Sequence, residues 1–298
     1  MAGQQRVYRQ RIKSTQALKK IFRAMELIAA SRIGKARDRA VTAAPYARML
    51  TRALSAVATH ATVDHPLTRP RTDTTKVAVL VLTADRGMAG AYTASVLRET
   101  ERLLAKLRED GKDPQIFVTG RRGLGYFTFR QRPVVRSWVG ESDAPTLETA
   151  HDIADTLLAA FAAPVDEGGV SELHIVYMRF QSMVTQAPRV LRMIPLEVVE
   201  GVEVPGEHEP LPLYDFEPSE EAVLDALLPL YIRSRIYAAL LQAAASELAA
   251  RQRAMHTATD NAEDLIRLYT RLANAARQAE ITQQISEIVS GADALASG

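Results

Sequence analysis

LYIRSRIYAALLQAAASELAARQRAMHTATDNAEDLIRLYTRLANAARQAEITQQISEIV, residues 230–289, is the stretch that decides the fold of this chain. It contains neither proline nor glycine and consists mainly of Ala, Leu, Arg, Gln and Glu, which lose little free energy on entering a helix. About 60 residues at 1.5 Å each form a rod of about 90 Å. An ordinary globular helix is several times shorter. A helix of this length, which we expect to span residues 219–292, needs a partner along its side.

The apolar positions of this helix predict how it meets its partner. They alternate in steps of four and three, a period of about 3.5 residues that is typical of a left-handed coiled coil. Beyond this seam the apolar phase moves to Ile281, Ile285 and Ile288, which we expect to face another protein. The predicted seam combines large apolar residues with small and polar ones: Leu227, Tyr231, Ser234, Ala238, Leu241, Ala245, Leu248, Gln252, Met255, Thr259, Ala262, Ile266, Tyr269 and Ala273.

A second long helix is predicted at the N-terminus, over residues 1–58. Its apolar residues Leu18, Ile21, Met25 and Ile28 follow the same spacing of three, four and three. Each long helix needs a partner, and the nearest one is the other helix. Because the rest of the chain lies between them, the two helices can pair in an antiparallel coiled coil.

Residues 76–200 predict a globular α/β domain inserted between the two helices. KVAVLVL at 76–82 is an apolar run typical of a strand buried on both faces of a sheet. Strands and helices then alternate, which indicates a Rossmann-like, mainly parallel sheet with an antiparallel edge. Linkers at 60–75 and 201–218 separate this domain from the helices. The other elements we expect are helices at 92–109, 121–130 and 146–161, and strands at 115–119, 134–139, 172–180 and 190–199.

Composition excludes several classes of protein. The 298 residues include no cysteine, so disulfides, thiolate metal sites and cysteine nucleophiles are ruled out. No apolar run approaches the ~18 residues of a membrane span, so we expect a soluble, intracellular chain whose membrane association is peripheral. The net charge of +2 conceals a basic N-terminal helix. Between residues 6 and 39, eleven Lys or Arg face only Glu26 and Asp38.

The residues indicate no catalytic, cofactor or metal site. There is no phosphate-binding P-loop, and the histidines are scattered without a metal-binding pair. The turn TADRGMAGAY at 83–92 lies between a predicted strand and a predicted helix, where phosphates often bind. It lacks the dinucleotide glycine pattern, so an ordinary turn is favoured over a nucleotide-binding enzyme. The basic first helix leaves a coiled-coil scaffold or a nucleic-acid-binding protein as the alternative function.

Three strings carry a family resemblance. IFRAMELIAASR at 21–32 resembles the N-terminal signature of the gamma subunit of F-type ATP synthases. AMHTATDN at 254–261 and ARQAEITQQISEIV at 276–289 resemble the closing signature of the same family. The turn at 83–92 and YDFEP at 214–218 also match, so the resemblance covers the chain from end to end.

The resemblance implies a rotor, in which the coiled coil is an asymmetric shaft inside a ring of three alpha and three beta subunits. The α/β body would lie beside the epsilon subunit and stand on the membrane-embedded ring of c subunits. Such a chain couples proton-driven rotation of the c ring to conformational cycling of the catalytic beta subunits for ATP synthesis. The chain itself would be non-catalytic, bind no cofactor, metal or nucleic acid, and lie at the cytoplasmic face of the cell membrane.

The resemblance also implies which residues meet other subunits. Arg277 and Gln278 match the family's polar contact to a beta subunit, with Thr282 on the same part of the shaft. The family often has glutamate where this chain has Gln284, which argues against an ionic contact there. The remaining expected contacts are Met25, Glu247, Arg251, Ile285 and Ile288 with the surrounding subunits, and Tyr214 and Glu217 with the c ring.

Overall fold

The computed structural model of the chain describes all but a few segments, namely residues 2–60, 67–196, 217 and 219–296. The described residues form two compact units. The hairpin unit combines Met1–Ala30 with Arg251–Gly298, and the body unit is Ser31–Ala250.

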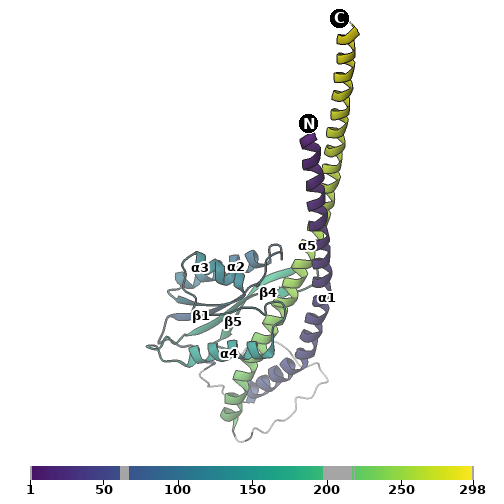
Figure 1. Ribbon diagram of the computed structural model, residues 1–298. Helices are drawn as coiled ribbons and strands as arrows, with labels where there is room; N and C mark the ends of the chain where they lie inside the picture. The colour runs from purple at the N-terminus through teal and green to yellow at the C-terminus, as the bar shows by residue number, and fades with distance from the viewer. Residues whose placement is uncertain (1, 61–66, 197–216, 218, 297–298) are drawn as a thin grey trace. The chain divides into compact units, whose positions relative to one another are not determined.

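Two long helices contribute to both units (Figure 1). α1 spans Ala2–His60 and α5 spans Glu220–Ala296, and each accommodates one internal proline, Pro45 and Pro229. Their length follows from the scarcity of helix-breaking residues in both stretches. The elements between them are β1 (Lys76–Leu82), α2 (Tyr92–Glu109), β2 (Asp113–Thr119), α3 (Arg121–Phe129), β3 (Arg136–Trp138), α4 (Leu147–Ala162), β4 (Glu172–Phe180) and β5 (Gln186–Ile194).

The described strands form one five-stranded sheet in the order β3-β2-β1-β4-β5. β1 pairs in parallel with β2 and β4, and β2 pairs in parallel with β3. β4 and β5 pair antiparallel. The predicted α/β fold, with a mainly parallel sheet and an antiparallel edge, is therefore confirmed, and β1, α2 and β4 have the predicted bounds.

Three strands differ from the sequence prediction. β2 begins at Asp113, two residues before the predicted start at 115. β5 begins at Gln186 and not at residue 190, because a tight hairpin pairs Gln186 with Phe180 at once. It ends at Ile194, before Pro195, which has no N–H to continue the ladder. The predicted strand residues 197–199 lie outside the described part of the chain. β3 is shorter than the predicted 134–139, because Gly140 turns the chain at a φ of 110° that favours glycine.

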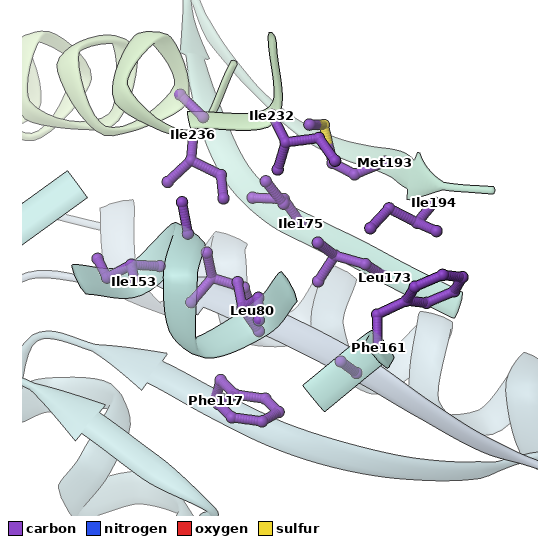
Figure 2. Packing of buried hydrophobic residues seen from close by; sticks show 14 of the residues in the cluster. Leu80, Phe117, Ile153, Phe161, Leu173, Ile175, Met193, Ile194, Ile232 and Ile236 are labelled. Carbon is purple, nitrogen blue, oxygen red and sulfur yellow. The ribbon is translucent and has the colours of Figure 1, made fainter. Parts of the chain in front are cut away.

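The side chains of β1 alternate between two apolar cores of the body unit, one on each face of the sheet. Val79 and Val81 pack with α2 and α3, whereas Leu80 packs with α4 and α5. Burial of both faces explains why this strand is continuously apolar in sequence. Figure 2 shows the second core, to which α5 contributes Ile232 and Ile236.

α1 and α5 pack against each other within the body unit. Ile33 and Ala36 of α1 form one apolar cluster with Ala245, Leu248 and Ala249 of α5. Small alanine side chains on both helices allow the two backbones to approach closely. This contact joins the α/β fold to both terminal helices.

In the hairpin unit, α1 and α5 lie side by side and antiparallel. The rings of Tyr8 and Tyr269 stack with their centroids 6.4 Å apart. Further along α1, Glu26 Oε1 lies 3.2 Å from His256 Nδ1. The residue number of the partner on α5 falls as the number on α1 rises, so the helices run in opposite directions. The predicted antiparallel pairing of the terminal helices is confirmed.

The α5 side of the predicted seam is correct in this unit, since Met255, Thr259 and Ala262 are buried. The α1 side is wrong. Glu26 and Ala29 are the buried residues there, each one position after a residue that we placed in the seam. The large apolar residues of the predicted α1 seam are exposed: Leu18 by 48%, Ile21 by 52% and Ile28 by 54%.

Charged partners on α5 explain this register. Lys19 forms an ion pair with Glu263, and Glu26 meets His256 and also accepts a hydrogen bond from Arg23 at 2.9 Å. Polar residues with such partners are tolerated at the helix interface. Directing them toward α5 turns the neighbouring apolar stripe outward.

This register predicts that two reciprocal substitutions change the free energy of unfolding by very different amounts. Ala29→Leu should lower the free energy of unfolding by about 1–3 kcal/mol, because a close-packed seam has no room for a larger side chain. Leu18→Ala, the reverse change at an exposed position, should alter it by less than about 0.5 kcal/mol. Urea unfolding followed by circular dichroism measures both. A larger loss from Leu18→Ala would show that the seam contains Leu18 after all.

Candidate functional site

The last part of α5 is a helix without a partner in the described chain. Ala273 is its last buried residue among those described, and every residue from 281 to 292 is exposed. Figure 1 shows α5 continuing past the first turn of α1. Ile285, Ile288 and Val289 are 56%, 71% and 54% exposed. Several large apolar side chains exposed on one helix mark a surface for protein interaction.

The predicted polar contacts lie on the same helix end. Arg277, Gln278 and Thr282 are all exposed, and the Thr282 hydroxyl donates to the Gln278 carbonyl at 3.0 Å. From Arg277 to Ile288 the helix covers about 17 Å. The structure therefore places these three polar residues, with Ile285 and Ile288, on one short length of helix that no other described part of the chain covers.

α1 presents a second exposed apolar face in the hairpin unit. Leu27 is 58% exposed and lies on the same helix as the exposed Ile21 and Ile28, and Met25 is half-buried. Sequence reasoning missed this face, because it assigned the stripe to the seam. A signal was available, since a helix with two apolar stripes can bury only one of them against a single partner helix.

Other predicted contact residues are placed differently. Glu247 in the body unit is 1% exposed and Arg251 in the hairpin unit is 6% exposed. Exposed fractions this small leave little surface for another subunit. Glu217 is exposed, and Tyr214 lies outside the described residues.

Several bases of α1 are engaged within the chain. These bases were the reason for considering nucleic acid as a partner. Three of these bases form half-exposed ion pairs with carboxylates of the same chain. This pairing makes the three bases less available to a nucleic-acid phosphate backbone. The pairs are Lys19 with Glu263, Arg23 with Glu26, and Arg32 with Asp143.

The turn at 83–92 lies at the carboxyl edge of the sheet, directly after β1. Phosphates bind at such edges by accepting from free N–H groups at a helix N-terminus. The first three N–H groups of α3 already have protein acceptors. The N–H of Arg121 donates to the Asp85 carboxylate at 3.1 Å. The next two N–H groups donate to the Ala84 carbonyl at 3.0 Å and to Thr83 Oγ1 at 2.9 Å.

Two glycines allow α3 to lie this close to the end of β1. A Cβ on Gly120 would meet the Thr83 carbonyl oxygen at 2.2 Å, and Gly120 has a φ of 88°. A Cβ on Gly123 would meet Thr83 Oγ1 at 2.6 Å. These glycines serve close packing of α3 against the end of β1 within the body unit.

Asp85 binds a second backbone segment. Its carboxylate also accepts the N–H groups of Gly140 and Ser142 at 2.8 and 3.0 Å. Burial is the largest single influence on the pKa of Asp85 and raises it, but the hydrogen bonds from Ser142, Gly140 and Arg121 together hold it below its ordinary value. Asp85 is therefore ionised at neutral pH and occupies the donors that a bound anion would need.

Substitutions at two glycines of this region should differ sharply. Gly120→Ala should lower the free energy of unfolding by at least about 3 kcal/mol, because both the backbone conformation and the nearby carbonyl exclude a Cβ. Gly125→Ala, inside α3 with no heavy atom within 4 Å of the new Cβ, should raise it by about 0.5–1 kcal/mol. Denaturant unfolding of the two variants measures both changes. Equal effects would contradict the close approach of α3 to Thr83.

The lowered pKa of Asp85 predicts an acid-dependent contribution to stability. A carboxylate with a lowered pKa stabilises the fold above its unfolded value, 3.8, and this stabilisation is lost as the pH falls through the folded value. Asp85→Asn should therefore cost about 1–3 kcal/mol at pH 7, and the difference from wild type should shrink as the pH drops below about 4.

Unfolding midpoints measured from pH 7 to pH 2.5 test this dependence. Asp166→Asn is the matched control, because Asp166 is an exposed turn residue, and it should change stability by less than about 0.5 kcal/mol. A pH-independent cost of Asp85→Asn would contradict the ionised hydrogen-bonded state.

The described residues contain neither a candidate metal centre nor a candidate membrane span. No three His, Asp or Glu side chains there gather closely enough to hold a metal ion. No helix in the same residues is both long enough and apolar enough to cross a bilayer.

The fold and these surfaces define a class of protein. Two long terminal helices pair antiparallel, an α/β body lies between them in sequence, and the exposed apolar surfaces lie on the helices. At the carboxyl edge of the sheet, the first three N–H groups of α3 are already paired within the body unit. These features define a protein of paired terminal helices with an inserted α/β domain.

Known proteins share this layout and sequence. The family model described as ATP synthase matches residues 4–295. The ATP synthase gamma chain of Beutenbergia cavernae is 73% identical over 296 residues, covering 99% of both chains. That of a Nocardioides species is 61% identical over 296 residues, covering 99% of this chain and 98% of the relative.

Two solved structures are similar in fold. The first is a chain of the Euglena gracilis mitochondrial ATP synthase, in a structure of OSCP/F1/c-ring. It has a TM-score of 0.70 at 16% identity, covering 100% of this chain and 96% of that one. The second is from the central stalk/c-ring of Tetrahymena thermophila mitochondrial ATP synthase. It has a TM-score of 0.56 at 21% identity, covering 80% of this chain and 99% of that one.

The chain therefore belongs to the ATP synthase gamma chain family. The resemblance carried by its terminal strings is confirmed. The alternative of a coiled-coil scaffold or nucleic-acid-binding protein finds no support in these relatives.

Proposed function

We propose that this chain is the central rotor shaft of an F-type ATP synthase. In this role it couples proton-driven rotation of a membrane c ring to conformational cycling of catalytic beta subunits. The observation that carries the proposal is the end of α5, where residues 281–292 are exposed on every side. Helices gain most of their stability by packing an apolar face, so this end requires a surrounding partner. Family membership across residues 4–295 supports a ring of alpha and beta subunits as that partner.

The exposed surfaces suit a shaft that must turn. Apolar contact is non-directional, so Ile285 and Ile288 can slide within an apolar collar without losing specific bonds. Arg277, Gln278 and Thr282 add polar contacts to a beta subunit. Several weak contacts of this kind hold the shaft without trapping it at one angle.

Asymmetry lets one shaft act differently on three identical beta subunits. α1 exposes a stripe that includes Leu18, Ile21 and Ile28, whereas the tip of α5 exposes a different set. Each beta subunit therefore meets a different surface at any moment. Shifting one site between tight and loose nucleotide binding by about 10⁴-fold requires a difference of about 5.5 kcal/mol, which many contacts along the shaft must share. Met25, half-buried beside the α1 stripe, belongs to this set.

Glu247 and Arg251 support coupling from inside the chain in this proposal. Both are charged, and both are more than nine-tenths buried. Removing or changing a buried charged group is strongly destabilising, so both side chains constrain how α5 packs. Their effect on other subunits therefore comes through the geometry of α5 more than through direct contact.

The rest of the chain forms the foot of the rotor. Glu217 is exposed, and we place it with Tyr214 at the c ring, with the epsilon subunit beside the α/β body. The chain is peripheral to the cytoplasmic face of the cell membrane and has no catalytic role of its own. In this description residues 1–58 and 219–292 are the shaft domains and residues 76–200 are the globular domain. The structures that this chain resembles include c-ring assemblies, which supports this arrangement.

Reconstitution tests the proposal directly. The purified chain should hydrolyse no ATP, whereas mixing it with alpha and beta subunits of the same organism should give a 3:3:1 complex with ATPase activity. Gel filtration and a coupled ATPase assay measure both. If the chain does not enter such a complex, the rotor function is rejected.

Variants of the helix end test the proposed contacts separately. Ile285→Asp and Ile288→Asp should each weaken assembly about 10–100-fold, because burial of an isoleucine side chain is worth about 1.5–3 kcal/mol. Glu287→Gln, on the same exposed turn, is the matched control and should assemble like wild type. Normal assembly of both aspartate variants would remove these two residues from the interface and leave the rotor function intact.

A further inference from the structure

The loop between β3 and α4, residues 139–146, is fastened to the end of β1. The Asp85 carboxylate accepts the N–H groups of Gly140 and Ser142, and the Asp85 N–H donates to Ser142 Oγ at 2.8 Å. The same carboxylate also accepts the first N–H of α3. One ionised side chain therefore ties this loop to β1 and α3, so the loop cannot move independently of the sheet.

Glu141 fastens the loop to α4. Its carboxylate accepts the hydroxyl groups of Thr146 and Thr149 at 2.9 and 2.7 Å. These bonds hold the pKa of Glu141 below its ordinary value, with the Thr149 hydroxyl contributing most. Thr146 also caps α4 by accepting the Thr149 N–H. Both ends of the loop are thus fixed within the body unit.

Between these two anchors, Asp143 reaches α1 and forms an ion pair with Arg32. α1 contacts the body again at Leu54 and Val57, which pack with the core beside α4 and α5. The two attachments are about 33 Å apart along the helix. At the Arg32 end, Ile33 and Ala36 also pack against α5, so the ion pair adds a directional bond to apolar contacts there.

α5 is joined to the sheet by two separate hydrogen bonds, one buried and one part-buried. The Ser246 hydroxyl donates to the Met178 carbonyl at 3.0 Å, and the Phe180 N–H donates to Gln242 Oε1 at 3.1 Å. The body is therefore fastened to α5 through β4, and to α1 both through Asp143 and through apolar packing.

We propose that loop 139–146 is a brace that carries twisting load between the α/β body and α1, with Arg32, Asp143 and Asp85 as positioning residues. The proposal rests on the rotor function proposed above, and no contact with another subunit is needed for it. Elsewhere α1 packs within the body unit through apolar contacts, of Ile33 and Ala36 with α5 and of Leu54 and Val57 with the core. Apolar packing is non-directional, so a directional bond from the loop to Arg32 adds resistance to twisting of the body against α1.

The brace acts on stiffness and contributes little to stability. The Arg32 side chain is 46% exposed and that of Asp143 is 18% exposed. Ion pairs with this much contact with water add little to the stability of a fold, and salt screens them. Changing the pair should therefore leave folding and assembly unchanged, and should loosen the angular connection between body and shaft.

Charge reversal in the assembled ATP synthase tests the brace. Arg32→Asp and Asp143→Arg should each lower proton pumping per ATP hydrolysed, because a body held less firmly transmits less of each rotation. Each should also widen the thermal angular fluctuations of a probe fixed to the body while the alpha and beta ring is immobilised. The double variant, with the charges exchanged, should recover both readouts.

The control is Arg37→Asp, which makes the same charge change on the same helix. Arg37 is exposed and forms no ion pair within the described chain, so this variant should behave like wild type. Melting of each purified variant checks that folding is preserved. Unchanged fluctuations in both single variants, or no recovery in the double variant, would overturn the brace. A wild-type chain that does not rotate with alpha and beta would overturn the rotor function as well, so the two failures are distinguishable.

Discussion

The antiparallel pairing of α1 with α5 is the constraint on which the rest of the structure depends. The two ends of one sequence meet, so everything between them must leave α1 and return to α5, and the α/β body is built on that path. Small residues such as Ala29 and Ala262 bring the helices close together. Charged residues in the seam, including Lys19 and Glu26, find partners on α5, and the large apolar side chains are consequently left on the outside.

That arrangement separates two tasks. Buried small and polar residues hold the helices together, and exposed apolar residues remain for other proteins. A shaft built from its largest apolar side chains would be more stable as an isolated pair, but it would have less apolar surface for a surrounding ring. The uncovered end of α5 is the extreme case, since Ile285 and Ile288 have no partner within the described residues.

The body shows why fold alone does not indicate function. Its sheet has the strand arrangement of many nucleotide-binding enzymes, yet Asp85 accepts the first N–H of α3 and two glycines let α3 pack against the end of β1. The donors that could bind a phosphate are used to join the loops to one another. The same side chain thereby holds the loop that reaches Arg32, so it contributes both to the pairing of α3 and to the bond between the body and α1.

The sequence by itself determined the two long helices, the bounds of β1, α2 and β4, the parallel sheet with its antiparallel edge, and the family. These follow from local composition, from the period of the apolar residues, or from contiguous strings. Only the tertiary structure decided which face of α1 meets α5, that Glu247 is buried, and that Arg32 meets Asp143. Arg32 and Asp143 are 111 residues apart in the chain, and no local pattern reports on such a contact. The physical reason is that burial and ion pairing depend on which distant side chains folding brings together.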